Sequence, residues 1–419
     1  MRNVLTAMLG LLVTQMVHGG ELPSLAKEAR SILGPDQGVY IEAANGQVLL
    51  AQAASKAVHP ASVSKVPTTL ALLRKLGPEH RFVTTFGSSG PVVDGALQGD
   101  LWVHADGNPS LVDEDALLVA DRLGELGINR VIGSLRLKGA LTFDWQSDED
   151  GARLRQALSG SISPAALASV RAFQLESHSD AVPGDALPAA TSLRPLGIAF
   201  MVPVGSPLAG TAGTAGTERI LVIHRSQPLL PLAKSLNDYS NNIFKPLADE
   251  AGGAAAVESL ARNVVPASMR DEITLGDGAG TDPRNRLSPR VTVSLLRALE
   301  KELHTTGHAL FDILPVAGID DGTLRHRFDN ANEAGRVVGK TGTFGDYGAS
   351  ALVGAISTSD LGTVYFAILN HGVPVPEARH RQDRFVRALL AKLHSQPWGY
   401  QRDVRPAIAR AEVVKGGQK

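Results

Sequence analysis

Cysteine is absent from this sequence of 419 residues. Without thiols the chain has no disulfide framework, no cysteine-ligated zinc, no iron–sulfur cluster and no thiolate nucleophile. An excess of charge of one sign is missing as well, because 41 basic side chains stand against 42 acidic ones and the net charge is -1. Nucleic-acid binding requires a strongly basic surface, so we expect no DNA or RNA partner. Covalent chemistry must therefore use an oxygen or nitrogen nucleophile.

Beyond the N-terminus, the sequence has no apolar run long enough to span a membrane. Arg2 precedes a mostly apolar segment at residues 4–17, which is shorter than the about 20 residues that a spanning helix needs. Compact residues at Val17 and Gly19 suit a signal-peptidase site. We therefore predict that residues 1–20 are a cleaved signal peptide and that the mature protein is soluble and periplasmic. An amphipathic first helix or a membrane anchor is the alternative.

The length of the chain exceeds the usual limit for one compact core, so we expect two or three domains. Apolar residues at 43% and charged residues at 20% are typical of globular proteins. Hydrophobic periodicity predicts helices at residues 62–75, at residues 229–263 and from Ser288-Pro289 to residue 303. Short apolar runs around turn residues predict hairpins at residues 38–51 and 349–370.

A change in amino-acid composition and in the predicted secondary structure indicates an inserted domain in the middle of the chain. Between residues 82 and 223 the sequence has Gly/Asp turns, short strands, one clear helix near residues 116–126 and a low-complexity stretch at residues 209–217. The predicted organisation is a catalytic domain made of residues 21–85 and 223–400, an inserted domain at 86–222 and a loosely held polar tail at 401–419.

The first motif with chemical meaning is Ser62-Val63-Ser64-Lys65. On a helix, positions i and i+3 share one face, so the amine of Lys65 can take the proton of the Ser62 hydroxyl. At the start of a helix the serine N–H is also free to stabilise an oxyanion. The same pattern occurs at Ser24 and Lys27, where a plain surface helix explains it. This motif alone is weak support for catalysis.

A second motif, Ser240-Asn241-Asn242, lies in a polar stretch. The hydroxyl of Ser240 could relay a proton, and the amide of Asn242 could hold both a lysine and a substrate carbonyl. The alternative interpretation is a turn or a helix cap without a catalytic role. Ser235-Leu236-Asn237 also matches the same pattern.

A third motif, Lys340-Thr341-Gly342-Thr343, precedes the second predicted hairpin. A strand with a lysine and two hydroxyls can bind a carboxylate, and Gly342 lets a ligand or another backbone approach closely. The alternative interpretation is an edge strand without a binding function, whose charged lysine prevents aggregation with other strands.

The three motifs together, in this order, are the parts that serine–lysine acyl enzymes such as penicillin-binding proteins and class A β-lactamases need. The chain resembles the class C low-molecular-mass penicillin-binding proteins, which are D-alanyl-D-alanine carboxypeptidases and endopeptidases. Further segments that carry the resemblance are His59–Ser62, 223–226, 237–242, 276–280, 285–289 and 314–318.

The resemblance implies an α/β (α+β) fold: a serine β-lactamase/transpeptidase-like domain with helices packed on an antiparallel sheet, plus an inserted smaller domain. It implies hydrolysis of peptidoglycan stem peptides through an acyl-enzyme, acylation by β-lactams, and no metal or cofactor. A β-lactamase or esterase of the same fold and a non-catalytic cell-wall-binding relative are the alternatives. Carboxypeptidase against endopeptidase preference and the oligomeric state stay open.

Carried over to this sequence, the resemblance makes Ser62 the nucleophile and Lys65 its base. Ser240 and Asn242 would line the cleft. The third motif would recognise the terminal carboxylate through Lys340 and Thr341, and Thr343 would supply the second oxyanion N–H. Two departures from the family pattern are Pro67 inside the nucleophile helix and a longer turn at residues 319–322.

Overall fold

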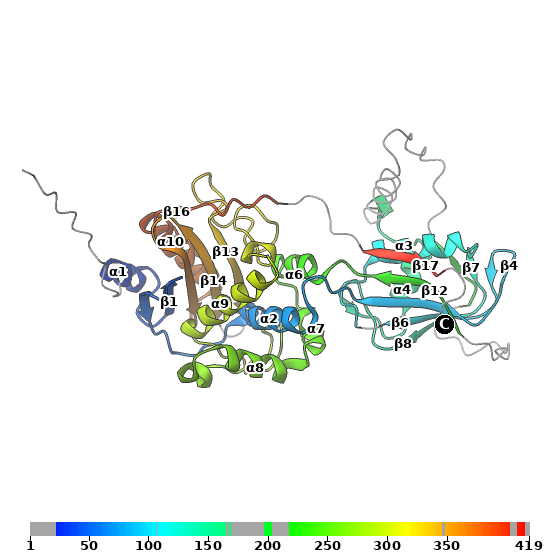
Figure 1. Ribbon diagram of the computed structural model, residues 1–419, viewed down its shortest axis with the longest axis horizontal. Coiled ribbons are helices and arrows are strands. Elements are labelled where there is room, and N and C mark those ends of the chain that lie inside the picture. Colours follow the sequence, from blue (N-terminus) through cyan, green and yellow to red (C-terminus); the bar gives the residue numbers. More distant parts are fainter. Residues whose placement is uncertain are drawn as a thin grey trace, which may run out of the picture.

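The computed structural model describes residues 22–105, 107–164, 167–168, 197–202, 218–345, 348–402 and 409–414. The predicted signal peptide and the low-complexity stretch lie outside these residues. Two bodies, each built on its own sheet, lie side by side along the long axis of the molecule (Figure 1). Among the described residues, no helix is both long and apolar enough to cross a membrane.

The larger sheet is antiparallel throughout and has the strand order β13-β14-β15-β1-β2, with the short β16 beside β14. Both predicted hairpins are confirmed, because β1 pairs with β2 and β14 pairs with β15. Strand β13, which carries the third motif, lies at the edge of the sheet. The bounds are β1 Gly38–Ala43, β2 Val48–Gln52, β13 Val337–Phe344, β14 Ala349–Thr358, β15 Gly362–Asn370 and β16 Ser395–Gln396.

Helices cover both faces of this sheet (Figure 1). Successive side chains of β14 alternate between two buried clusters: Leu352 packs on the side of α1 and α10, whereas Val353 packs on the side of α2 and α9. The near-continuous apolar run of β14 follows from burial on both faces. The bounds are α1 Pro23–Ile32, α2 Lys65–Leu76, α6 Leu229–Asp238, α7 Phe244–Glu250, α8 Gly253–Val264, α9 Pro289–Thr305 and α10 Val375–Lys392.

The helical periodicity predicted for residues 229–263 is divided among α6, α7 and α8. The breaks coincide with left-handed backbone, at Ser240 with φ 56° and at Gly252 with φ 99°. The helix predicted after Ser288 is confirmed as α9, and the Ser288 hydroxyl accepts a hydrogen bond of 3.2 Å from the Val291 N–H as its N-cap.

The smaller body has a five-stranded sheet of order β17-β12-β3-β6-β8, with α3 and α4 packed over it. The helix predicted near residues 116–126 is confirmed as α3. A second small sheet has the order β11-β7-β5-β4. The main bounds are β3 Val83–Ser88, β6 Leu101–Ala105, β8 Leu135–Lys138, β12 Arg219–Arg225, α3 Asp113–Glu125 and α4 Ala152–Leu158; the short strands are β4 Val92–Val93, β5 Ala96–Leu97, β7 Arg130–Val131 and β11 Ala199–Phe200.

The prediction of a loosely held polar tail is wrong at residues 410–413. Residues Arg410–Val413 form β17, which pairs antiparallel with β12 at the edge of the smaller sheet. An edge strand needs to bury only alternate side chains, so the single inward residue Ala411 is enough to join the core. The chain therefore returns from the larger body to complete the smaller one.

The domain boundaries stay a prediction, which the strand pairing refines. Strands β3 and β12 pair with each other in the smaller sheet, and the predicted boundaries at residues 85 and 222 fall inside these two strands. We propose that the inserted domain begins with β3 and ends with β12.

Candidate active site

Ser62 lies in a short 3-10 helix, Ala61–Ser64, that leads directly into α2. Two glycines let neighbouring backbone approach this turn. A Cβ on Gly342 of β13 would lie 2.5 Å from the Pro60 carbonyl oxygen, and a Cβ on Gly280 would overlap the carbonyl of Ala61. The turn that carries the predicted nucleophile is thus held between β13 and the loop after residue 276.

The side chain of Lys65 is fully buried and makes three hydrogen bonds. Its Nζ donates to Ser62 Oγ at 2.8 Å, to Asn242 Oδ1 at 3.2 Å and to the Ala279 carbonyl at 2.5 Å. Burial lowers the pKa of Lys65 to about 7, with the negative charge of Asp277 acting in the opposite direction. A large fraction of this amine is neutral at pH 7, as a general base requires.

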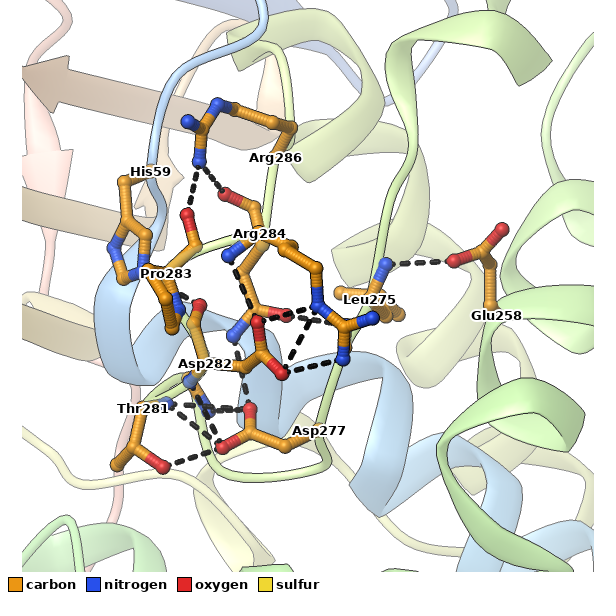
Figure 2. A network of polar contacts seen from close by, with 12 residues as sticks. His59, Glu258, Leu275, Asp277, Thr281, Asp282, Pro283, Arg284 and Arg286 are labelled. Carbon is orange, nitrogen blue, oxygen red and sulfur yellow. Dashed lines mark hydrogen bonds and ion pairs between the residues drawn. The ribbon is translucent and has the colours of Figure 1, made fainter.

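The carbonyl of Ala279 belongs to a loop that is built around the carboxylate of Asp277. Figure 2 shows the contacts of Asp277 with Thr281 and its neighbours. Burial alone would raise the pKa of Asp277, but hydrogen bonds from neighbouring side chains and N–H groups outweigh it and lower the pKa. Asp277 therefore stays ionised and orders the loop that offers its carbonyl to Lys65. The donors are Gly280 N at 2.7 Å, Thr281 N at 3.0 Å, Thr281 Oγ1 at 2.5 Å, Asp282 N at 3.1 Å and Asn285 Nδ2 at 2.9 Å.

Lys340 of β13 is the second fully buried lysine. Its Nζ donates to Ser240 Oγ at 2.8 Å and to the Thr341 carbonyl at 2.8 Å. Burial lowers the pKa of Lys340 well below its ordinary value, the charge of Lys65 lowers it further, and Asp238 acts in the opposite direction. Ser240 has a left-handed φ of 56°, which is uncommon outside glycine and occurs most at functional sites.

The two threonines of the third motif contact residues that the sequence did not single out. The Thr341 hydroxyl donates to Thr323 Oγ1 at 2.9 Å, and the exposed Thr343 Oγ1 accepts a hydrogen bond of 2.7 Å from Arg379 Nη2. Thr323 directly follows the turn at residues 319–322, where the sequence departs from the family pattern. Its place in the sequence could therefore have identified it as a candidate site residue. Arg379 is one of several arginines of α10 and carried no such signal.

The structure brings the three motifs together and separates the competing matches from them. Ser62, Lys65 and Asn242 form one hydrogen-bonded group, and Ser240 and Lys340 form another. The alternative matches have ordinary surroundings: Ser24 and Lys27 are exposed on α1, Ser235 is exposed on α6, and the Asn237 amide donates to the Ile313 carbonyl. Within the part of the chain that is described, no cluster of His, Asp and Glu could hold a metal ion.

The two departures from the family pattern leave the site intact. Pro67 is the third residue of α2, and proline is tolerated in the first turn of a helix. In the turn at residues 319–322, the buried Asp320 accepts hydrogen bonds from Lys234 Nζ at 2.5 Å and Tyr400 OH at 2.9 Å. Gly322, with φ 89°, lies against the carbonyl of Asp238, two residues before Ser240.

The sequence also matches known proteins. The model of the D-Ala-D-Ala carboxypeptidase 3 (S13) family matches residues 21–186 and 148–392. A D-alanyl-D-alanine carboxypeptidase from Actinomadura sp. (strain R39) is 26% identical over 449 residues, which cover 86% of this chain and 82% of that protein.

Two solved structures from Bdellovibrio bacteriovorus have a similar fold. The Bd0816 predatory endopeptidase, in complex with the immunity protein Bd3460, has a TM-score of 0.69 at 24% identity, over 89% of this chain and 97% of that one. The penicillin G acylated Bd3459 predatory endopeptidase has a TM-score of 0.69 at 22% identity, over 89% and 96%. The predicted fold class is confirmed.

Proposed function

The chain belongs to the D-Ala-D-Ala carboxypeptidase 3 (S13) family, and from this premise we propose that it hydrolyses peptidoglycan stem peptides through a Ser62 acyl-enzyme. The reaction is that of a serine-type carboxypeptidase or DD-endopeptidase, and β-lactams acylate the same serine. The observation that carries the proposal is the contact between Lys65 Nζ and Ser62 Oγ at 2.8 Å, with the pKa of that lysine lowered to about 7.

Acylation begins when Ser62 Oγ attacks the carbonyl carbon of the penultimate D-alanine. The hydroxyl proton passes to the neutral amine of Lys65, because the two atoms already share a hydrogen bond. The N–H groups of Ser62 and Thr343 stabilise the oxyanion of the tetrahedral intermediate.

The second half of acylation breaks the peptide C–N bond, and the leaving amine needs a proton. We assign this step to Ser240 Oγ, which Lys340 Nζ holds at 2.8 Å. Ser240 gives its hydroxyl proton to the leaving nitrogen and takes up the proton that Lys65 received from Ser62, so that Lys65 is neutral again. Asn242 keeps Lys65 oriented through its amide oxygen. A water molecule then attacks the ester with Lys65 as its base, which releases the shortened stem peptide and restores the Ser62 hydroxyl.

The substrate and compartment follow from the same premise. Strand β13 is an edge strand next to Ser62, so a stem peptide can add to it as a further strand. Stem peptides lie outside the cytoplasm, and we propose that residues 1–20 direct the protein to the periplasm and are then removed.

The proposal is tested with the purified mature protein and two reagents. A peptide that ends in D-alanyl-D-alanine should release D-alanine, and a fluorescent penicillin should form an adduct that survives for minutes or longer. Rapid hydrolysis of the penicillin without release of D-alanine from the peptide would favour the β-lactamase alternative. A protein that neither cleaves the peptide nor binds penicillin covalently would be the non-catalytic relative.

The pH dependence of acylation should follow the titration of Lys65. Because only the neutral amine can accept the proton, the rate constant for acylation by penicillin should rise through a midpoint near the pKa of about 7. One pH unit below the midpoint, the rate should be about ten-fold below its plateau. Stopped-flow labelling across this range measures the profile, with circular dichroism at each pH as the control for folding. A midpoint near the ordinary lysine value of 10.5 would contradict Lys65 as the base.

A further inference from the structure

The proposed substrate carries a negative charge, and neither Lys65 nor Lys340 offers an accessible cation to bind it. A stem peptide that ends in D-alanine has a terminal carboxylate, and β-lactams carry a carboxylate too. Lys65 and Lys340 both have no exposed surface, and each amine is already hydrogen-bonded inside the protein. Burial lowers the pKa of both lysines, and neither side chain reaches the surface, where a ligand could meet its charge. The carboxylate therefore needs another cation.

The alternation of side chains along β13 shows where that cation lies. Neighbouring residues of a strand point to opposite faces, so Lys340 and Gly342 share one face and Thr341 and Thr343 share the other. The first face meets Ser240 and the nucleophile turn. The second face meets Thr323 and, at the exposed Thr343, Arg379.

Arg379 is an exposed arginine of α10. Its guanidinium, which is always charged, contacts Thr343 of the third motif. Its Nη2 donates to Thr343 Oγ1, so the hydroxyl hydrogen of Thr343 is free to donate to a ligand. Two other arginines of the helix are ion-paired, Arg381 with Glu377 and Arg387 with Glu333, whereas Arg379 makes no such pair among the described residues. A guanidinium and a hydroxyl side by side match the two oxygens of a carboxylate.

We propose that Arg379 and the hydroxyl of Thr343 bind the terminal carboxylate of the substrate, and that Lys340 serves the proton relay through Ser240 instead. This inference rests on the proposed function and names the group that selects substrates with a free carboxylate. Arg379 is then a specificity-determining residue, which acts beside Thr343 at the third motif.

The test compares Arg379→Gln with Arg384→Gln, a matched control that removes the charge of another exposed arginine on the same helix. Each variant is assayed on a D-alanyl-D-alanine peptide with a free C-terminus and on the same peptide amidated there, and is also acylated with benzylpenicillin. Arg379→Gln should lower kcat/KM for the free peptide, and the acylation rate with penicillin, by about ten- to hundred-fold. The amidated peptide and the control variant should be affected by less than about two-fold.

Three results would overturn the inference. Equal losses on both peptides would show that Arg379 supports the fold of β13, and equal losses in Arg384→Gln would show a general effect of surface charge. Normal kinetics of Arg379→Gln with the free peptide and with penicillin would remove its role altogether. The proposed function fails separately, and only if the wild-type protein releases no D-alanine.

Discussion

Ser62→Ala should abolish covalent labelling by penicillin and reduce release of D-alanine to background, because no other hydroxyl is hydrogen-bonded to Lys65 among the described residues. The folded state should survive. The variant removes one hydrogen bond, which contributes about 1 kcal/mol, and Lys65 keeps its contacts to Asn242 and Ala279. Mass mapping of the labelled peptide and thermal unfolding measure the two effects.

Ser64→Ala is the matched control for this result. Ser64 is buried two residues after Ser62, and its hydroxyl has no hydrogen-bond partner among the described residues. We expect Ser64→Ala to label normally. Label on Ser64 or Ser24 in the wild-type protein, or persistent labelling of Ser62→Ala, would assign the nucleophile to another residue.

Lys65→Ala should slow acylation by about 10²- to 10⁴-fold, because the Ser62 hydroxyl loses the only base within hydrogen-bond reach among the described residues. The loss is measured as the second-order rate constant with fluorescent penicillin. The substitution also leaves the Ala279 carbonyl and the Asn242 amide without their donor, so the fold must be checked by thermal unfolding.

Two further variants separate the missing amine from the empty space. Lys65→Met keeps most of the buried volume and should be as slow as Lys65→Ala if the amine is what matters. Lys27→Ala removes the exposed lysine of the competing match and should acylate at the normal rate. Near-normal acylation of Lys65→Met would mean that another group takes the proton.

Contacts between residues close in sequence could be predicted from the sequence, because helix and strand periodicity alone decides them. The spacing of Ser62 and Lys65 predicted their contact, and the turn residues between apolar runs predicted the hairpin of β14 and β15. The resemblance to a known family then selected Ser240 and Asn242 over the competing match at Ser235 and Asn237.

Backbone groups of the site, and strands without a clear hydrophobic pattern, could not be predicted from the sequence. The Ala279 carbonyl that binds Lys65 is a backbone atom, which every residue has, and only the loop around Asp277 places it. The strand β17 was missed for a related reason: one inward alanine in four residues leaves almost no hydrophobic pattern at an edge.

The residues of this sequence thus determine which side chains can do chemistry, since a serine, two lysines and their helix and strand are local properties. The tertiary structure decides their electrostatics, because burial sets the pKa of Lys65 and Lys340 and depends on chain segments far apart in sequence. It also decides that Lys340 faces Ser240 while Arg379, on a helix after the last long strand, reaches Thr343. No periodicity along the chain encodes that second contact, because it arises only when α10 packs against the sheet.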